Sequence, residues 1–234
     1  MSPSRRLRFR LCLHHYVFKG PLRNPLTSSA DHAHHCCRKQ IIARHNGLRD
    51  HWISLYQQAG WQALEEQWVP ELARATPVRA DIRASGTAAE PLTYCDVKVT
   101  HVVRWHGPTS TWRGEARGAA AAAGEAEKLK IYEPSETGSP VRIVPLVFET
   151  AGRWGEAAAR ELRRVARARA CKIARTAVDP DAVYRATLTR WRRELSTLLQ
   201  RANTTVVMAS AGCAVSLHSR GPVVETHDLI PEAH

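Results

Sequence analysis

The chain has 234 residues, enough for one domain of ordinary size and a short additional segment. Hydrophobic residues make up 44% and charged residues 24%, a composition that argues against intrinsic disorder and supports a packed core. Thirty-four Lys and Arg against 22 Asp and Glu give a net charge of +12, which indicates a nucleic-acid partner reached through its phosphates. The alternative is a solvated basic face that has no partner.

The six cysteines lack the dense, even spacing of a secreted disulfide framework. We therefore expect a protein of the nucleus or cytoplasm that is not secreted. No apolar run approaches the roughly 20 residues needed to cross a bilayer, so we expect no membrane partner. Residues 1–30 show no steady hydrophobic period and are expected to be poorly ordered.

The first regular element that the sequence predicts is a helix over residues 38–60. Apolar and aromatic side chains recur there at steps of three and four. They are Ile41, Ile42, His45, Leu48, Trp52, Leu55 and Tyr56. Gly60 is a natural helix stop. Residues 63–69 could be either the end of a helix or a short strand.

Two neighbouring strands are predicted next. Residues 78–84 alternate apolar and charged side chains, the period of two that is typical of a strand. Residues 92–103 form the second strand, with Asp96 and Lys98 on one face and Cys95 and Val97 on the other. Because the two runs are separated by a short turn, we expect an antiparallel hairpin.

The rest of the chain alternates between helices and one strand. We expect a loop over 104–114, a helix over 115–133, a strand over 141–149, and helices over 156–176 and about 181–202. Pro145 lies within the apolar strand and argues for an edge position or a bulge. The order of elements predicts one α/β (α+β) domain with a small mixed sheet, a hairpin and flanking helices.

The residues with the clearest chemical signature are Asp81 on the first strand and Asp96 and Lys98 on the second. Hairpin pairing can bring the two carboxylates together, and a divalent cation such as Mg²⁺ would relieve their repulsion. Glu65 or Glu66 could complete that metal site. Lys98 would orient an attacking water or neutralise charge developing on a phosphate.

A purely structural interpretation of the same residues stays open at this stage. Asp and Lys two residues apart on the wet face of a strand are common, and short motifs match by chance. Asp81 between two arginines could form a surface salt bridge that contributes under about 1 kcal/mol.

Six segments, in order, carry a resemblance that covers about residues 31–210. They read DHAHHC at 31–36, ARHNGLRD at 43–50, RADIRASG at 79–86, CDVKVTH at 95–101, EKLKIY at 127–132 and PLVFETAGRWGEAA at 145–158. The chain resembles the restriction-like, PD-(D/E)xK endonuclease region at the C-terminus of non-LTR retrotransposon reverse-transcriptase proteins. That resemblance implies a restriction-endonuclease-like core.

The resemblance also implies roles for individual residues. Asp81 and Asp96 would bind the metal, Lys98 would act at the scissile phosphate, and Lys130 and Tyr132 would lie near the active site. An ordinary charged helix face is the alternative for the last two.

The same resemblance suggests contacts with nucleic acid outside the catalytic residues. Arg44 and His45 match a basic pair associated with DNA contact, although His45 could instead pack against a neighbouring helix. Arg79, beside Asp81, is a further candidate for contact with nucleic acid.

The sequence departs from the family pattern in two places. Ala80 replaces the usual Pro, while the carboxylate that follows it is retained. A zinc knuckle normally precedes this nuclease, and only His32 and Cys36 fit it, so we expect a degenerate knuckle without zinc. The polymerase signature Tyr-x-Asp-Asp is absent from this sequence.

The sequence thus predicts a disordered or knuckle-like segment over 1–37, a restriction-endonuclease-like domain over 38–215 and a loose tail over 216–234. The expected activity is Mg²⁺-dependent hydrolysis of DNA phosphodiesters. The alternative is a catalytically inactive, basic module of the same fold that binds DNA or RNA, and a third possibility is a remnant that folds poorly.

Overall fold

The computed structural model describes residue 34 and the ranges 37–72, 77–86, 92–106, 109–112, 116–132, 141–174 and 179–210. Its helices are α3 (Arg38–Gln58), α4 (Ala119–Ile131), α5 (Glu156–Ile173) and α6 (Pro180–Ser210), with a 3₁₀ turn η1 (Pro70–Leu72). Its strands are β1 (Gln62–Trp68), β2 (Arg79–Ser85), β3 (Thr93–Thr100), β4 (Val103–His106), β5 (Thr109–Trp112) and β6 (Arg142–Glu149).

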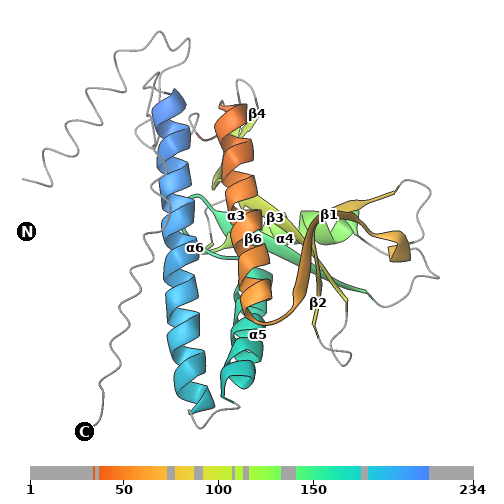
Figure 1. Cartoon of the computed structure of the whole chain (residues 1–234). Helices are drawn as coiled ribbons and strands as arrows, with labels where there is room; N and C mark the ends of the chain where they lie inside the picture. Colours follow the sequence, from red (N-terminus) through yellow and green to blue (C-terminus); the bar gives the residue numbers. More distant parts are fainter. Residues whose placement is uncertain are drawn as a thin grey trace, which may run out of the picture.

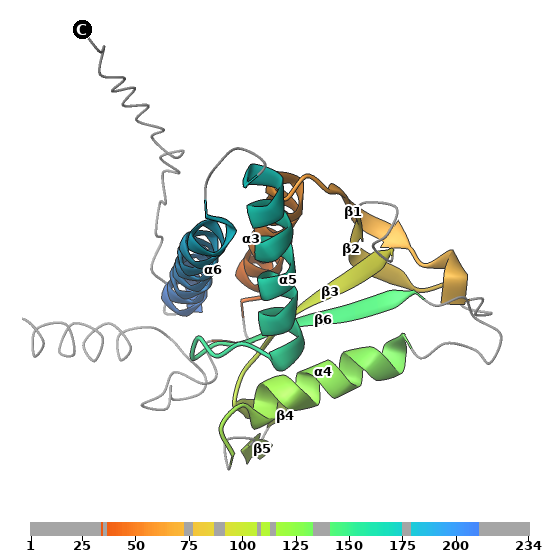
Figure 2. The ribbon, with the colours of Figure 1, turned by 90° about the horizontal axis from the view of Figure 1, so that it is seen from below.

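A four-stranded mixed sheet separates two helical layers. The strand order is β1-β2-β3-β6; the first two pairings are antiparallel, and β3 and β6 run parallel. Helices α3 and α5 cover one face, α6 packs against both of them, and α4 lies on the other face (Figures 1 and 2). This arrangement confirms the predicted fold class: an α/β domain with a small mixed sheet, a hairpin and flanking helices.

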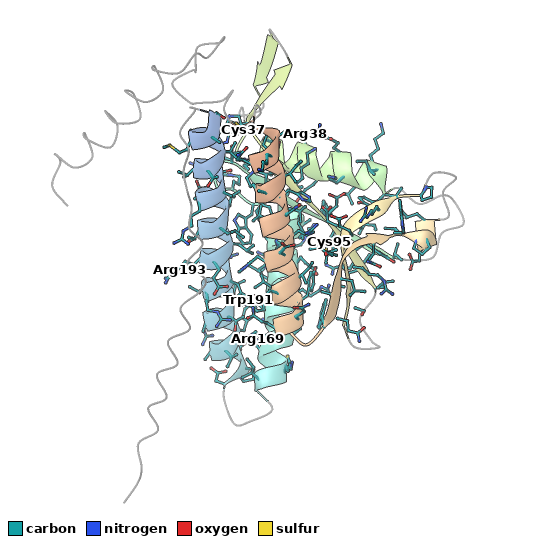
Figure 3. All side chains as sticks on the ribbon, turned by 45° about the horizontal axis from the view of Figure 1, so that its top comes forward. Cys37, Arg38, Cys95, Arg169, Trp191 and Arg193 are labelled. Atoms are coloured by element: carbon teal, nitrogen blue, oxygen red, sulfur yellow. The ribbon has the colours of Figure 1, made fainter. Side chains whose placement is uncertain are left out.

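The larger core lies between the sheet and α3, α5 and α6. The alternation predicted for β3 is confirmed, because Cys95 and Val97 point into this core together with Trp52 and Trp191. Figure 3 places Cys95 between the sheet and α3, and Trp191 where α5 and α6 meet. A smaller cluster on the opposite face contains Tyr94 and Tyr132. The second cluster holds α4 against the strands that carry the acidic residues.

Several element boundaries agree with the sequence analysis. Gly60 follows α3 with φ of +88°, a left-handed conformation that glycine adopts without steric cost. Residues 63–69, left open between helix and strand, belong largely to β1. Pro145 lies in β6, the edge strand next to β3, as its missing N–H requires. The last helix extends to Ser210.

One prediction of secondary structure was wrong. Residues 104–114 were expected to form a loop, but β4 and β5 pair there as a short antiparallel hairpin. Strands of four residues are too short to show a clear period of two. None of the helices in the described ranges combines the length and the apolarity needed to traverse a bilayer.

Candidate active site

The two aspartates meet where β2 and β3 part. Pairing of the strands ends at Ile82 and Cys95, so Asp81 and Asp96 occupy the next position on each strand. The backbone N–H of Val97 donates to Asp81 Oδ2 at 2.7 Å, a bond that ties the two strands through a side chain. The two carboxyl groups are close enough to interact electrostatically. The central sequence-based expectation, that hairpin pairing brings both acids together, therefore holds in the structure.

Asp81 reaches toward α3. Its Oδ2 lies 3.0 Å from Nε2 of His45, whose Nδ1 lies 3.2 Å from Asn46 Oδ1. Burial alone would raise the pKa of Asp81, but the hydrogen bond and charge of His45, with the Val97 N–H, outweigh burial and lower that pKa. The pKa of His45 is raised, chiefly by its hydrogen bond to Asp81. His45 thus favours the ionised form of Asp81.

Asp96 reaches toward α4. Lys128 Nζ lies 2.6 Å from Asp96 Oδ1, and the Tyr132 hydroxyl lies 2.6 Å from Asp96 Oδ2. Burial raises the pKa of Asp96, and neither Lys128 nor Tyr132 fully offsets it; the negative charge of Asp81 raises it further. The two neighbouring acids therefore have pKa values pushed apart in opposite directions, as expected for carboxyls that share a confined site.

Lys98 lies on the same face of β3 as Asp96, two residues further along the strand. Its Nζ forms a 2.7 Å ion pair with Glu127 Oε2 on α4. The close approach of α4 depends on Gly124, where an added Cβ would lie 2.9 Å from Val147 Cγ1 and 3.7 Å from Lys98 Cδ. The sheet and α4 together therefore hold two acids and two lysines in one cluster, hereafter the acid–lysine cluster: Asp81, Asp96, Lys98 and Lys128.

Tyr132 belongs beside this cluster, as expected, but Lys130 does not. Lys130 is exposed on α4, and Lys128 contacts Asp96 in its place. Residues four apart share a helix face and residues two apart do not. Lys128 and Tyr132 have that spacing, so the signal that identifies Lys128 was present in the sequence and was missed.

The remaining predicted site residues lie elsewhere. Glu65 is 62% exposed, and its carboxylate pairs with Arg49 at 2.8 Å. Arg79, at the start of β2, pairs with Glu66 and is exposed at the surface, where nucleic acid could reach it. Arg44 was expected to contact DNA, but it is buried, and its Nη1 donates to Asn203 Oδ1 of α6 at 2.8 Å. It is therefore not placed to contact DNA. Burial lowers its pKa to about 10.

Asp81 and Asp96 are the side chains of the cluster that could hold a metal ion. Within the described ranges, no three His, Cys, Asp or Glu side chains gather as a metal site, and Glu65 contributes nothing to Asp81 and Asp96. Mg²⁺ nevertheless needs only one or two carboxylates when water and phosphate oxygens supply its other ligands. Asp81 and Asp96 fit that requirement. His32 and Cys36, the two residues expected from a zinc knuckle, lie outside the described residues.

Comparison with known proteins provides no family assignment. A scan against protein-family models finds no match for the chain, and a search of curated proteins finds no significant relative. A function for the chain is therefore inferred mainly from the geometry of the acid–lysine cluster.

Tyr132→Phe is expected to lower the free energy of unfolding by about 1–2 kcal/mol. The hydroxyl lies 2.6 Å from Asp96 Oδ2 and 2.9 Å from the backbone oxygen of Arg79, and its loss leaves a buried carboxyl with one donor fewer. Urea unfolding followed by circular dichroism measures the change. Tyr184→Phe is the matched control, because Tyr184 contacts Arg167 through its ring. Equal losses in both variants would mean that the Tyr132 hydroxyl has no special role.

Proposed function

We propose that the chain is a restriction-like, metal-dependent endonuclease that hydrolyses DNA phosphodiesters. One observation supports this proposal above the others: two paired strands place two interacting carboxyls next to each other, and a lysine lies two residues beyond one of them. The net charge of +12 favours binding to the phosphate backbone. The resemblance in six ordered segments points to the same activity and to a retrotransposon origin, with the nucleus or cytoplasm as the place of action.

Asp81 and Asp96 would hold Mg²⁺ between them. Bound there, the ion would lower the pKa of a coordinated water and stabilise negative charge on the phosphate. His45 keeps Asp81 ionised by hydrogen bonding to Oδ2 at 3.0 Å, which makes this carboxylate ready to bind a cation. Lys128 occupies Asp96 Oδ1 at 2.6 Å and must give way before that oxygen can bind a cation.

Lys98 is the group best placed to act on the phosphate. It shares a strand face with Asp96, so its ammonium can reach a phosphate held at the two carboxylates. Its present partner, Glu127 Oε2, is on the outer surface of α4 with the side chain 47% exposed. An ion pair with that much solvent exposure contributes little to stability, so Lys98 can exchange Glu127 for a phosphate oxygen at a small cost in free energy. Lys98 would then neutralise the charge that develops during hydrolysis.

A second candidate function follows from the same ion pairs. Both lysines of the acid–lysine cluster are neutralised by acids of the chain itself, Lys98 by Glu127 and Lys128 by Asp96. The positive charges of the two lysines are thus neutralised without a bound metal ion. This favours a catalytically inactive, basic module of the same fold that binds DNA or RNA without cutting it. Retention of nucleic acid that weakens with salt, and is not accompanied by cleavage, would favour this alternative.

Asp96→Asn is expected to reduce nicking of supercoiled plasmid in Mg²⁺ by at least about 100-fold, since it removes a negatively charged ligand from the cation. Gel separation of supercoiled and relaxed plasmid, after titration of enzyme and Mg²⁺, gives the rate. Asp181→Asn changes an exposed aspartate at the start of α6 and should leave the rate unchanged. If the wild type does not nick, or Asp96→Asn nicks equally well, the endonuclease proposal fails.

A further inference from the structure

A polar hollow of about 500 Å³ opens between α3 and the outer strands of the sheet. Its lining comes from α3 and from the outer strands β1 and β2: Asn46, Arg49, Glu65, Glu66, Gln67 and Arg79. Three consecutive residues of β1 line it, although successive side chains of a regular strand alternate between faces. Glu66 has a φ of +50°, and this left-handed residue breaks the alternation. The hollow is therefore shaped by a local departure from strand geometry.

The hollow is linked directly to the acids. Arg79 precedes Asp81 by two residues on β2, a span of about 7 Å along a strand. Asn46 Oδ1 lies 3.2 Å from His45 Nδ1, and His45 Nε2 lies 3.0 Å from Asp81 Oδ2. A nucleotide next to a phosphate held at Asp81 would therefore fall within reach of this hollow.

The chemistry of the lining suits a nucleobase better than a phosphate. A phosphate accepts hydrogen bonds and needs donors only, whereas two walls of the hollow are the carboxylates of Glu65 and Glu66. Asn46 Oδ1 lies beside His45 Nδ1, and Gln67 Nε2 donates to the backbone oxygen of Glu65, so Asn46 offers its amide N–H groups as donors and Gln67 its amide oxygen as an acceptor. Mixed donors and acceptors match the hydrogen-bonding edge of a base, on which amino groups and ring acceptors alternate.

An exposed aromatic ring stands at the rim. Trp68 is 59% exposed, and the guanidinium carbon of Arg79 lies 5.9 Å from the centre of its ring. Trp68 also pairs with Arg79 across the strands. Base–aromatic stacking is a main source of affinity for unpaired nucleic acid, and a nearby arginine adds a cation–π contribution. Trp68 at the rim and polar groups within the hollow would hold the face and the edge of one base.

We propose that this hollow binds the base of an unpaired nucleotide adjacent to the phosphate held at Asp81 and Asp96. A paired base has its hydrogen-bonding edge and both faces occupied within the duplex, so only an unpaired or extruded base can enter. The substrate class follows: DNA that carries an unpaired nucleotide next to the cut, in place of fully paired duplex. This inference rests on the proposed endonuclease function for the position of the phosphate.

Binding without divalent metal separates this proposal from the catalytic one. Fluorescence anisotropy would compare a labelled duplex with the same duplex carrying one unpaired nucleotide. The wild type should bind the second DNA more tightly, and Trp68→Ala should weaken that binding by about tenfold while leaving duplex binding unchanged. Trp68→Phe should retain most of the preference. Leu64→Ala is the matched control, because Leu64 is an apolar residue of the same strand, 50% exposed, outside the lining.

Two results would overturn the proposal. One is equal affinity of the wild type for the two DNAs; the other is a Trp68→Ala variant that loses affinity for both DNAs alike, which would make Trp68 a general backbone contact. A thermal melt of each variant verifies that it is folded. Preference for the unpaired nucleotide without any plasmid nicking would support base binding in the hollow and contradict the endonuclease proposal. Nicking without that preference would support the endonuclease proposal and contradict base binding in the hollow.

Discussion

Glu161→Ala is expected to lower the free energy of unfolding by about 3 kcal/mol. Glu161 is fully buried on α5, and its carboxylate accepts from the Tyr56 hydroxyl at 2.7 Å, from Arg164 at 2.6 Å and from Arg142 at 2.7 Å. Its removal leaves Tyr56 without that acceptor and two cations without their counter-charge. Arg142 and Arg164 retain some solvent contact, so the loss is smaller than for a wholly buried pair.

Urea unfolding of Glu161→Ala and of a surface control measures this difference. Glu156→Ala is the control, because Glu156 lies in the first turn of the same helix, is exposed and pairs with Arg163 at 3.3 Å. Surface ion pairs contribute less than about 1 kcal/mol, so the control should change stability little. Losses of similar size in the two variants would show that the buried network around Glu161 does not stabilise the domain.

The same network has a predicted pH signature. Burial would raise the pKa of Glu161, but Arg164, Arg142 and Tyr56 outweigh burial and hold that pKa below its ordinary value of 4.5. A depressed carboxyl pKa stabilises the folded state above the unfolded value, and that contribution is lost as pH falls through the folded pKa. The stability advantage of wild type over Glu161→Ala should therefore be constant near neutral pH and shrink below about pH 4.5.

Local sequence patterns were sufficient to predict most of the secondary structure and one part of the site. Alternation in β2 and β3 identified Asp81, Asp96 and Lys98 as neighbours, because a period of two and a short turn leave few other arrangements. Pro145 indicated an edge strand, since it cannot donate to a ladder. These inferences depend on residues close together in the chain, where geometry follows from the backbone alone.

Contacts between distant segments were the part that could not be predicted. His45 bonds Asp81 across 36 positions, and Arg44, its neighbour, is buried against Asn203 across 159. Which of two adjacent basic residues faces the site depends on how α3 is rotated against α6 and the sheet. A helix with charged and apolar residues on several sides leaves that rotation undefined in the sequence. The positive φ of Glu66, which shapes the hollow, likewise has no signature in the residue type.

Lys98 and Lys128 are expected to affect Mg²⁺-dependent cleavage in different ways. Lys128 Nζ lies 2.6 Å from Asp96 Oδ1 and so competes with a cation for that oxygen. Lys128→Ala should therefore lower the Mg²⁺ concentration that gives half-maximal nicking, with a smaller effect on the rate at saturating Mg²⁺. Lys98 pairs with Glu127 and does not occupy either aspartate. Lys98→Ala should lower the saturated rate by about 100-fold or more, with little change in that concentration.

Plasmid nicking across a Mg²⁺ titration separates the two effects, with Lys130→Ala as the control, because Lys130 is exposed on the same helix. If Lys128→Ala abolished the saturated rate while Lys98→Ala only shifted the titration, the roles would be exchanged and Lys128 would be the phosphate contact. That result would mean that the helix, and not the strand, supplies the catalytic cation. The spacing of Asp96 and Lys98 would then reflect a strand with a solvated face, and the cluster would owe its chemistry to the packing of α4.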